Sequence, residues 1–311
     1  MITCKVCGKE FESDSSLHKH LRAHKLRMVE YYQKYFPRYD LYDKKIIKFK
    51  SKQFYFEADF NTKTNLKKWI KEQPEDIAKK YCDDFLTNRI ETRDLKYAPT
   101  EVELRTIMSP PTLFLDNILD GYYKYCNDKG LINRFKSIPT EGLIKRTESL
   151  QNEAIYVDTR EQKPLKFKIP IEVKTLNFGD YAFSNAEVSG NTYIERKSIG
   201  DFIGTMSGGF ERFKKEIERS IEKDAYLIIL VEDTLSNCMS FNYLPHVSKK
   251  IKATPEFVFH NVRQLIQAYP SIQFLFVKGR AEASRLIQRI FVCGGMHKEI
   301  DLQLAYDMKL L

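Results

Sequence analysis

The feature that most constrains the fold is a β-hairpin over residues 180–197 that carries charged residues at its open end. A symmetric hairpin pairs Asp180 with Glu195, and side chains paired in this way lie roughly 5 Å apart on one face. Strand alternation places Lys197 on the same face as Glu195 and Arg196 on the opposite face. The sequence therefore predicts two carboxylates and one ammonium group on one side of a sheet.

This charged cluster has two interpretations. Carboxylates held so close together repel each other unless a cation neutralises them, and Mg²⁺ commonly binds one or two carboxylates together with water. The alternative is an ion-pair ladder on a solvated surface, because Glu-Arg-Lys tripeptides are common in proteins. The residues on either side of the hairpin favour the metal site.

Four charged elements follow one another in a fixed order along the chain. They are the strand end Val157-Asp158-Thr159-Arg160-Glu161, then Gly179-Asp180, then Glu195-Arg196-Lys197, and finally Asp201. This order resembles the nuclease domain of the XPF and Mus type structure-specific endonucleases, whose signature is Gly-Asp, a variable gap, Glu-Arg-Lys, three residues and Asp. The resemblance covers about residues 153 to 293.

The resemblance implies a restriction-endonuclease-like core with a metal-dependent site. Asp158, Asp180 and Glu195 would hold Mg²⁺ or Mn²⁺, and Lys197 would orient or activate the attacking water. It also implies DNA with a fork or flap as the substrate and a 5′-phosphate product.

Arg160, Arg196 and Asp201 match further positions of the family near the active site. We expect Arg160 to contact a phosphate and Arg196 to form an ion pair with Asp201. Asp201 would also open a helix, where a carboxylate stabilises the amino-terminal end of the helix dipole. Catalytic and purely structural roles therefore both stay open for Asp201.

The remainder of residues 151–311 alternates between strands and helices, which is typical of an α/β domain with a mixed sheet flanked by helices. A helix is predicted over 210–221, with an apolar stripe on one side and basic residues that include Arg212 and Lys215 on the other. This basic side either follows a DNA backbone or is simply solvated.

The amino terminus has the spacing of a zinc site. Cys4 and Cys7 are followed by twelve residues, then His20, three more residues and His24. Residues 1–25 thus resemble a Cys2His2 zinc finger of the ββα type, and such a segment depends on Zn²⁺ because it is too short to bury a core, with the metal supplying roughly 10 to 16 kcal/mol. His18 lies on the other side of the predicted helix, so we do not expect it to bind the metal.

Three uses of the finger remain open. Its basic residues could contact DNA without strong base discrimination, the finger could dock a protein partner, or it could be a structural cap. The residues expected to contact DNA are Lys19, Arg22 and Lys25.

Residues 26–150 form a basic, aromatic-rich segment without an assignable motif. We expect a mostly helical module, with helices over 75–92 and 111–127 and a hinge around 136–152. Lysines alternate with aromatic and aliphatic residues over 44–56, which predicts a basic-faced strand pair. The basic and aromatic residues suit either a groove for single-stranded nucleic acid or ordinary core packing.

Composition narrows the class of protein. The 51 Lys and Arg against 42 Asp and Glu give a formal charge of +9, which suits a polyanionic partner or a basic surface kept for solubility. No apolar run reaches the roughly 18 residues of a membrane span, and no signal pattern opens the chain, so we expect an intracellular protein, in a bacterial cytoplasm or a nucleus, without membrane contact. The six cysteines are too scattered for a disulfide framework.

We therefore expect an Mg²⁺-dependent endodeoxyribonuclease that hydrolyses branched or flapped DNA in repair, recombination or replication. A non-catalytic DNA-binding scaffold and a zinc-finger adaptor that recruits a partner to DNA are the alternatives. No helix-hairpin-helix signature follows Val292 and no nucleotide-binding loop is present. These departures from the family leave both a homodimer and the preferred DNA structure open.

Overall fold

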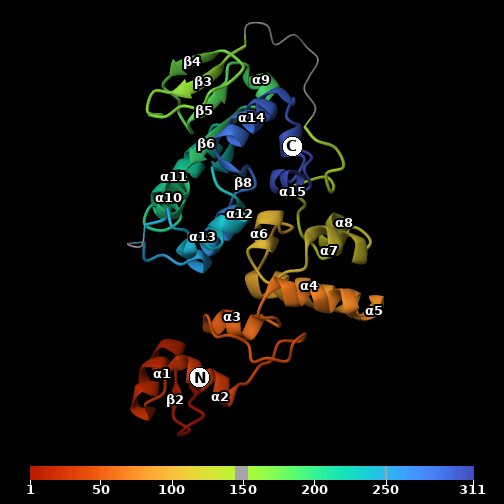
Figure 1. The fold of residues 1–311 in the computed structure, drawn as a ribbon, viewed down its shortest axis with the longest axis vertical. Coiled ribbons are helices and arrows are strands. Elements are labelled where there is room, and N and C mark those ends of the chain that lie inside the picture. The colour runs from red at the N-terminus through yellow and green to blue at the C-terminus, as the bar shows by residue number, and fades with distance from the viewer. Residues whose placement is uncertain (144–152, 249–250) are drawn as a thin grey trace. The chain divides into compact units, whose positions relative to one another are not determined.

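The computed structural model describes residues 1–143, 153–248 and 251–311, and these fall into two compact units. The first unit comprises Met1–Cys82 and Met108–Pro110, and the second comprises Asp83–Ile107 and Pro111–Leu311 (Figure 1). Most of the expected hinge over 136–152, and the boundary expected at residue 150, lie outside the described residues. The division into three segments at residues 25 and 150 stays a prediction.

The first unit begins with the ββα arrangement expected for the finger. Strands β1 (Ile2–Thr3) and β2 (Glu10–Phe11) pair antiparallel, and helix α1 (Asp14–His20) continues into a short 3-10 turn at Leu21–His24. The unit then continues through helices α2 (Met28–Tyr35), α3 (Lys52–Glu57) and α4 (Lys63–Glu72).

The finger shares its hydrophobic core with the helices that follow it. Leu17 and Leu21 are buried in one cluster with Tyr31, Tyr32 and other apolar side chains. The finger residues alone offer too little apolar surface for a core of their own, so packing on α2 extends that core.

The strand pair expected over 44–56 is wrong. Residues 44–51 contain no strand beyond an isolated bridge from Ile46 to Tyr39, and helix α3 covers the rest of the segment. The helix begins where the Ser51 hydroxyl accepts a hydrogen bond from the Phe54 backbone N–H at 3.0 Å. A serine in this position is a favourable helix cap. The local capping signal therefore outweighs the alternation of lysines and aromatics.

The second unit starts within helix α5 (Glu75–Arg93) and continues through helices α6 (Glu101–Arg105), α7 (Thr112–Ile118) and α8 (Tyr122–Asp128). The single helix expected over 111–127 is divided into α7 and α8, because Gly121 has φ +109° and interrupts the helical backbone. Helices thus dominate the middle of the chain, as predicted.

A six-stranded mixed sheet forms the centre of the second unit. Its strands are β3 (Ile155–Asp158), β4 (Ile171–Lys174), β5 (Tyr181–Phe183), β6 (Thr192–Lys197), β7 (Tyr226–Val231) and β8 (Ile272–Phe276). Their order in the sheet is β4-β3-β5-β6-β7-β8. Strand β5 runs antiparallel to both of its neighbours, and the other pairs are parallel.

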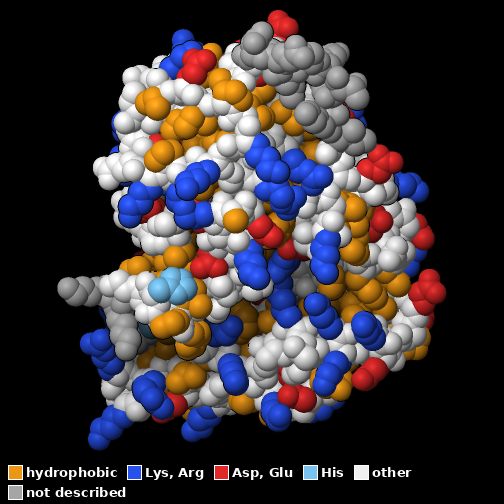
Figure 2. All heavy atoms as spheres, turned by 45° about the horizontal axis from the view of Figure 1, so that its top comes forward, with side chains coloured by type: hydrophobic (Ala, Val, Ile, Leu, Met, Phe, Trp, Pro, Cys, Tyr) orange, Lys and Arg blue, Asp and Glu red, His pale blue; other side chains and the backbone are white. Residues whose placement is uncertain are grey.

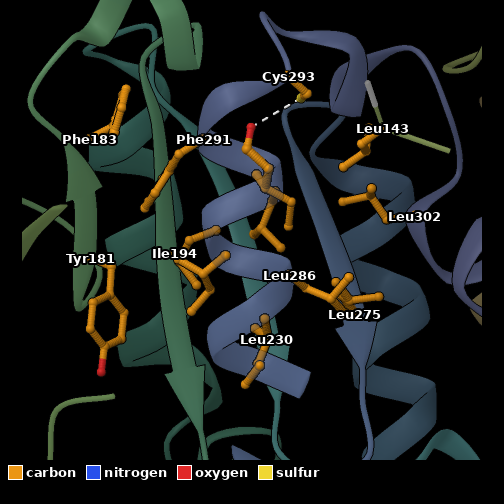
Figure 3. Packing of buried hydrophobic residues seen from close by; sticks show 14 of the residues in the cluster. Leu143, Tyr181, Phe183, Ile194, Leu230, Leu275, Leu286, Phe291, Cys293 and Leu302 are labelled. Carbon is orange, nitrogen blue, oxygen red and sulfur yellow. Dashed lines mark hydrogen bonds between the residues drawn. The ribbon is translucent and has the colours of Figure 1, made fainter. Parts of the chain in front are cut away.

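Helices cover both faces of the sheet (Figure 1). One face packs against α14 (Gly279–Val292), with the short helices α9 (Ala186–Ser189) and α15 (Leu302–Asp307) in the same cluster. The other face packs against α10 (Ile199–Thr205), α11 (Phe210–Ile221), α12 (Leu235–Cys238) and α13 (Pro255–Ala268). Figure 3 shows the first core, where Phe291 of α14 stacks on Phe183 of β5.

The described helices include none long and apolar enough to span a lipid bilayer. All six cysteines are free thiols.

The turn before β5 depends on Gly179. This residue has φ +60°, and a Cβ atom added to it would lie 2.7 Å from the Ile194 carbonyl oxygen. We expect Gly179→Ala to lower the free energy of unfolding by about 1 to 3 kcal/mol, because strain and a backbone clash add together. Urea unfolding measures this loss. Gly204→Ala is the matched control, since nothing lies within 4 Å of its added Cβ. An equal effect of the two substitutions would refute the assignment.

Two buried acids connect α6 to the segment before α15. The Glu101 backbone N–H donates to Asp301 Oδ2 at 2.7 Å, and the Thr112 hydroxyl donates to the Glu101 carboxylate. Burial raises the pKa of Glu101 to about 7 and the pKa of Asp301 to about 6. Both carboxyl groups thus bind a proton more tightly in the folded chain than in the unfolded chain, so the folded protein loses stability as the pH rises through these values.

We expect Glu101→Gln to raise the unfolding temperature at pH 8 and to have little effect at pH 5, because glutamine resembles the protonated acid. Each kcal/mol gained should appear as about 2 to 4 °C in thermal unfolding followed by circular dichroism. The exposed Glu222→Gln serves as the control. A lower unfolding temperature of Glu101→Gln at pH 8 would show that the charge of Glu101 stabilises the fold.

Candidate active site and metal-ligand cluster

Strand alternation places the predicted acids on one face of the sheet. Ile155 and Val157 of β3, Tyr181 of β5 and Ile194 of β6 all point into the core under α14. Their sequence neighbours therefore face the other side of the sheet, toward α10 and α11. These neighbours are Asp158, Asp180 and Glu195, and Lys197 shares the face of Glu195.

The hairpin has the predicted register. Tyr181 pairs with Ile194, and the Asp180 backbone N–H donates to the Ile194 carbonyl at 2.7 Å. The Asp158 backbone N–H donates to the Asp180 carbonyl at 2.9 Å, which joins the end of β3 to the start of β5. Backbone hydrogen bonds thus hold three charged segments side by side at the same ends of the neighbouring strands β3, β5 and β6.

Asp180 and Glu195 interact as predicted for a close pair of acids. Burial raises the pKa of Asp180 to about 7, and the negative charge of Glu195 adds to the increase. In these surroundings, the ionised form of the Asp180 carboxyl group is stabilised by any positive charge that binds beside it.

Lys197 is the positive charge of this face. Its Nζ donates to Glu195 Oε1 at 2.8 Å and lies 4.8 Å from the centre of the Phe213 ring on α11. Lys197 is only 7% exposed, so its ammonium group is held in place by the helix above and the carboxylate beside it.

Asp158 is oriented differently from the other two acids. It is 2% exposed, and its carboxylate accepts hydrogen bonds from the Leu176 N–H at 2.7 Å and from Arg160 Nε at 2.6 Å. Burial alone would raise the pKa of Asp158, but these hydrogen bonds hold it below its usual value. The structure thus brings Asp180, Glu195 and Lys197 together, whereas the carboxylate of Asp158 is hydrogen-bonded to Arg160.

Arg160 remains open to solvent while it pairs with Asp158. Its side chain is 69% exposed, and the charges of Glu216 and Asp180 also act on it. Arg160 therefore lies at the rim of the acidic face, where a phosphate could reach it.

Arg196 lies on the opposite face, and the expected ion pair with Asp201 is wrong. Its guanidinium contacts Glu161 Oε2 at 2.7 Å and Glu232 Oε2 at 3.0 Å. Burial disfavours the charge, yet these two carboxylates raise the pKa of Arg196. The Arg196 backbone N–H nevertheless serves the site, because it donates to Asp180 Oδ2 at 2.7 Å.

Asp201 lies in the first turn of α10, as expected. Its carboxylate accepts a hydrogen bond from the Ser198 hydroxyl at 2.7 Å, and the same hydroxyl accepts from the Asp201 N–H at 3.2 Å. These contacts satisfy the structural role of Asp201 and do not test a catalytic one.

Sequence reasoning missed three acids around the site. Glu161 and Glu232 clamp Arg196, and Glu216 on α11 interacts with both Glu195 and Lys197. Glu161 stands in the strand-end motif, which was a signal for it. Glu216 could have been noticed as an acid within the apolar stripe of its helix, whereas nothing local marks Glu232.

The finger residues form a second cluster. The ligand atoms of Cys4, Cys7, His20 and His24 all lie within 4.8 Å of one another, and within the described ranges no other group of three or more Cys, His, Asp or Glu is arranged to hold a metal ion. His18 is directed elsewhere, since its Nε2 lies 2.9 Å from the Tyr32 hydroxyl.

The basic residues that we expected to contact DNA are exposed. Many Lys and Arg side chains lie on the face drawn in Figure 2. The expected set consists of Lys19, Arg22 and Lys25 in the finger and Arg212 and Lys215 on α11.

One protein family and several solved structures are similar to part of this chain. Residues 157–290 match the ERCC4 domain family. Two solved structures are similar, XPF from Aeropyrum pernix in complex with DNA and XPF from the same organism, each at 22% identity over 44% of this chain, with TM-scores of 0.33 and 0.34. The matches cover 62% and 59% of those chains, and no curated protein sequence matches significantly. The part of the chain that carries the acidic face thus matches the ERCC4 domain family, and its fold is a mixed sheet flanked by helices.

Proposed function

We propose that this protein is a metal-dependent DNA endonuclease that cuts phosphodiester bonds in branched or flapped DNA. The single observation that carries the proposal is the convergence of Asp180, Glu195 and Lys197 on one face of an ERCC4-type domain. Repair, recombination or replication of DNA is the process in which such an activity would serve.

The donor set of the acidic face fits a hard divalent cation. Asp180 and Glu195 offer carboxylate oxygens, which Mg²⁺ and Mn²⁺ prefer. Burial raises the pKa of Asp180 and the charge of Glu195 raises it further, so a positive charge beside the pair would relieve both effects. Asp158 is the third candidate ligand, and it would join after giving up part of its contact with Arg160.

The chain's own residues supply the remaining parts of a hydrolytic site. A bound Mg²⁺ or Mn²⁺ would supply the positive charge that activates water and stabilises the charge developing on the phosphate. Lys197 donates hydrogen bonds and would orient the attacking water. Arg160 at the rim would bind a phosphate oxygen through its exposed guanidinium, which suits phosphate geometry.

The finger would hold Zn²⁺ and contribute to DNA binding. Two cysteines and two histidines at this spacing are the ligand set typical of structural zinc, and Cys4, Cys7, His20 and His24 would hold the ion. Lys19, Arg22 and Lys25 would then contact phosphates on one side of the finger, while Arg212 and Lys215 would do so beside the acidic face. A protein partner that docks on the finger is the alternative use of the same surface.

We expect Asp180→Asn and Lys197→Ala each to reduce metal-dependent cleavage by at least about 100-fold, because each removes a group next to the reacting phosphate. The measurement is cleavage of end-labelled flaps, forks, junctions and single strands in Mg²⁺ or Mn²⁺. Glu187→Gln and Lys223→Ala remove the same charges at exposed positions and should cleave as the parent does. Failure of the parent to cut every substrate, or full activity of both site variants, would refute the proposed function.

We expect one zinc per chain in the purified protein, because the four ligand atoms are already gathered. Cys7→Ser should lose most of it, as measured by atomic absorption, and should make the first unit more sensitive to protease. His18→Gln is the matched control, since it changes a histidine of the same helix that is not a ligand, and it should keep the metal. Equal zinc content in Cys7→Ser and the parent would contradict this assignment.

A further inference from the structure

Helix α11 places an acid where its buried stripe calls for an apolar residue. Phe213, Ile217 and Ser220 are buried on the side that faces the sheet. Glu216 follows Phe213 by three positions and precedes Ser220 by four, so it lies on this same side of the helix. The side chain is half-buried, whereas Lys215 next to it is exposed.

Glu216 faces the candidate active site. The Phe213 ring, one turn earlier on α11, covers the Lys197 ammonium at 4.8 Å. Burial raises the pKa of Glu216, and the negative charge of Glu195 raises it further, while Lys197, Arg219 and Arg160 act in the opposite direction. Across the described residues, no hydrogen bond or ion pair reaches its carboxylate.

This position of Glu216 is unfavourable unless its carboxylate gains a partner when the site binds a ligand. A half-buried acid that faces a second acid and lacks a close partner destabilises the folded chain. Lys197 donates to Glu195 at 2.8 Å in this structure. If Glu195 shared its oxygens with a divalent cation, Lys197 would lose the one carboxylate that lies within hydrogen-bonding distance of it among the described residues.

We propose that Glu216 is a positioning residue that takes over the Lys197 ammonium when Glu195 binds a cation. Glu195 belongs to β6 and Glu216 to α11, the helix whose Phe213 ring lies 4.8 Å from the Lys197 ammonium, and a change of side-chain rotamer would make the exchange. Glu216 thus keeps the Lys197 side chain in position beside the acidic face while Glu195 is engaged.

This inference rests on the proposed nuclease function, so the first test uses cleavage. Glu216→Gln should lower kcat about 10- to 100-fold, as loss of a residue that orients an active-site group typically does, with KM for DNA changed less than about two-fold. Glu211→Gln removes the same charge at an exposed position of α11 and should have no effect. In a Lys197→Gln background, Glu216→Gln should cause no further loss. Parent-like kcat in Glu216→Gln, or multiplied losses in the double variant, would overturn the inference.

A second readout does not require activity. Thermal unfolding of the parent, Glu216→Gln, Lys197→Gln and the double variant gives the coupling between the two residues. We expect Glu216→Gln to leave the unfolding temperature unchanged or to raise it without metal, because it removes an unpartnered acid, and to lower it by about 2 °C or more when Mg²⁺ is present. In the Lys197→Gln background it should not lower the unfolding temperature at all. Coupling that Mg²⁺ leaves unchanged would overturn the inference even if the parent cuts DNA. A loss of Mg²⁺ stabilisation that persists without Lys197 would do the same, since it would make Glu216 a ligand.

Discussion

The pairing of β5 with β6 is the interaction on which the candidate site depends. Its register brings Asp180 to Glu195, and it requires Gly179 because a side chain there would meet the Ile194 carbonyl. Backbone hydrogen bonds therefore hold the two carboxylates close together despite their repulsion. Without a cation this repulsion lowers the stability of the sheet. The same pairing keeps the two acids close enough to bind one cation together.

Strand β6 divides its charged residues between two environments. Glu195 and Lys197 face α11, where ionic groups have few partners and can respond to a ligand. Arg196 faces the other side, where Glu161 and Glu232 fix its guanidinium between them. In the tripeptide Glu195-Arg196-Lys197, the first and last side chains can thus change partners, whereas the arginine side chain is fixed. The fixed arginine also holds in place its backbone N–H, which donates to Asp180.

Local patterns in the sequence were sufficient for much of the fold. Alternation and symmetry predicted the hairpin register, and the apolar stripe predicted the helix over 210–221. The partners of Arg196 were not predictable, because Glu161 and Glu232 reach it only through the order of strands in the sheet. The contact between Glu101 and Asp301 joins residues 200 positions apart and has no local signal. Alternation was misleading over 44–56, where a serine cap begins a helix.

The shared core of the finger limits how anything can approach it. Leu17 and Leu21 are committed to Tyr31 and Tyr32, so one flank of α1 is already occupied by the protein itself. A free finger on a flexible tether would lose rotational freedom upon capture of a target, and that entropy would weaken the complex. In this protein the packing of α1 on α2 already fixes the orientation of the finger. A ligand therefore binds a preformed surface, and little binding free energy is lost in ordering that surface.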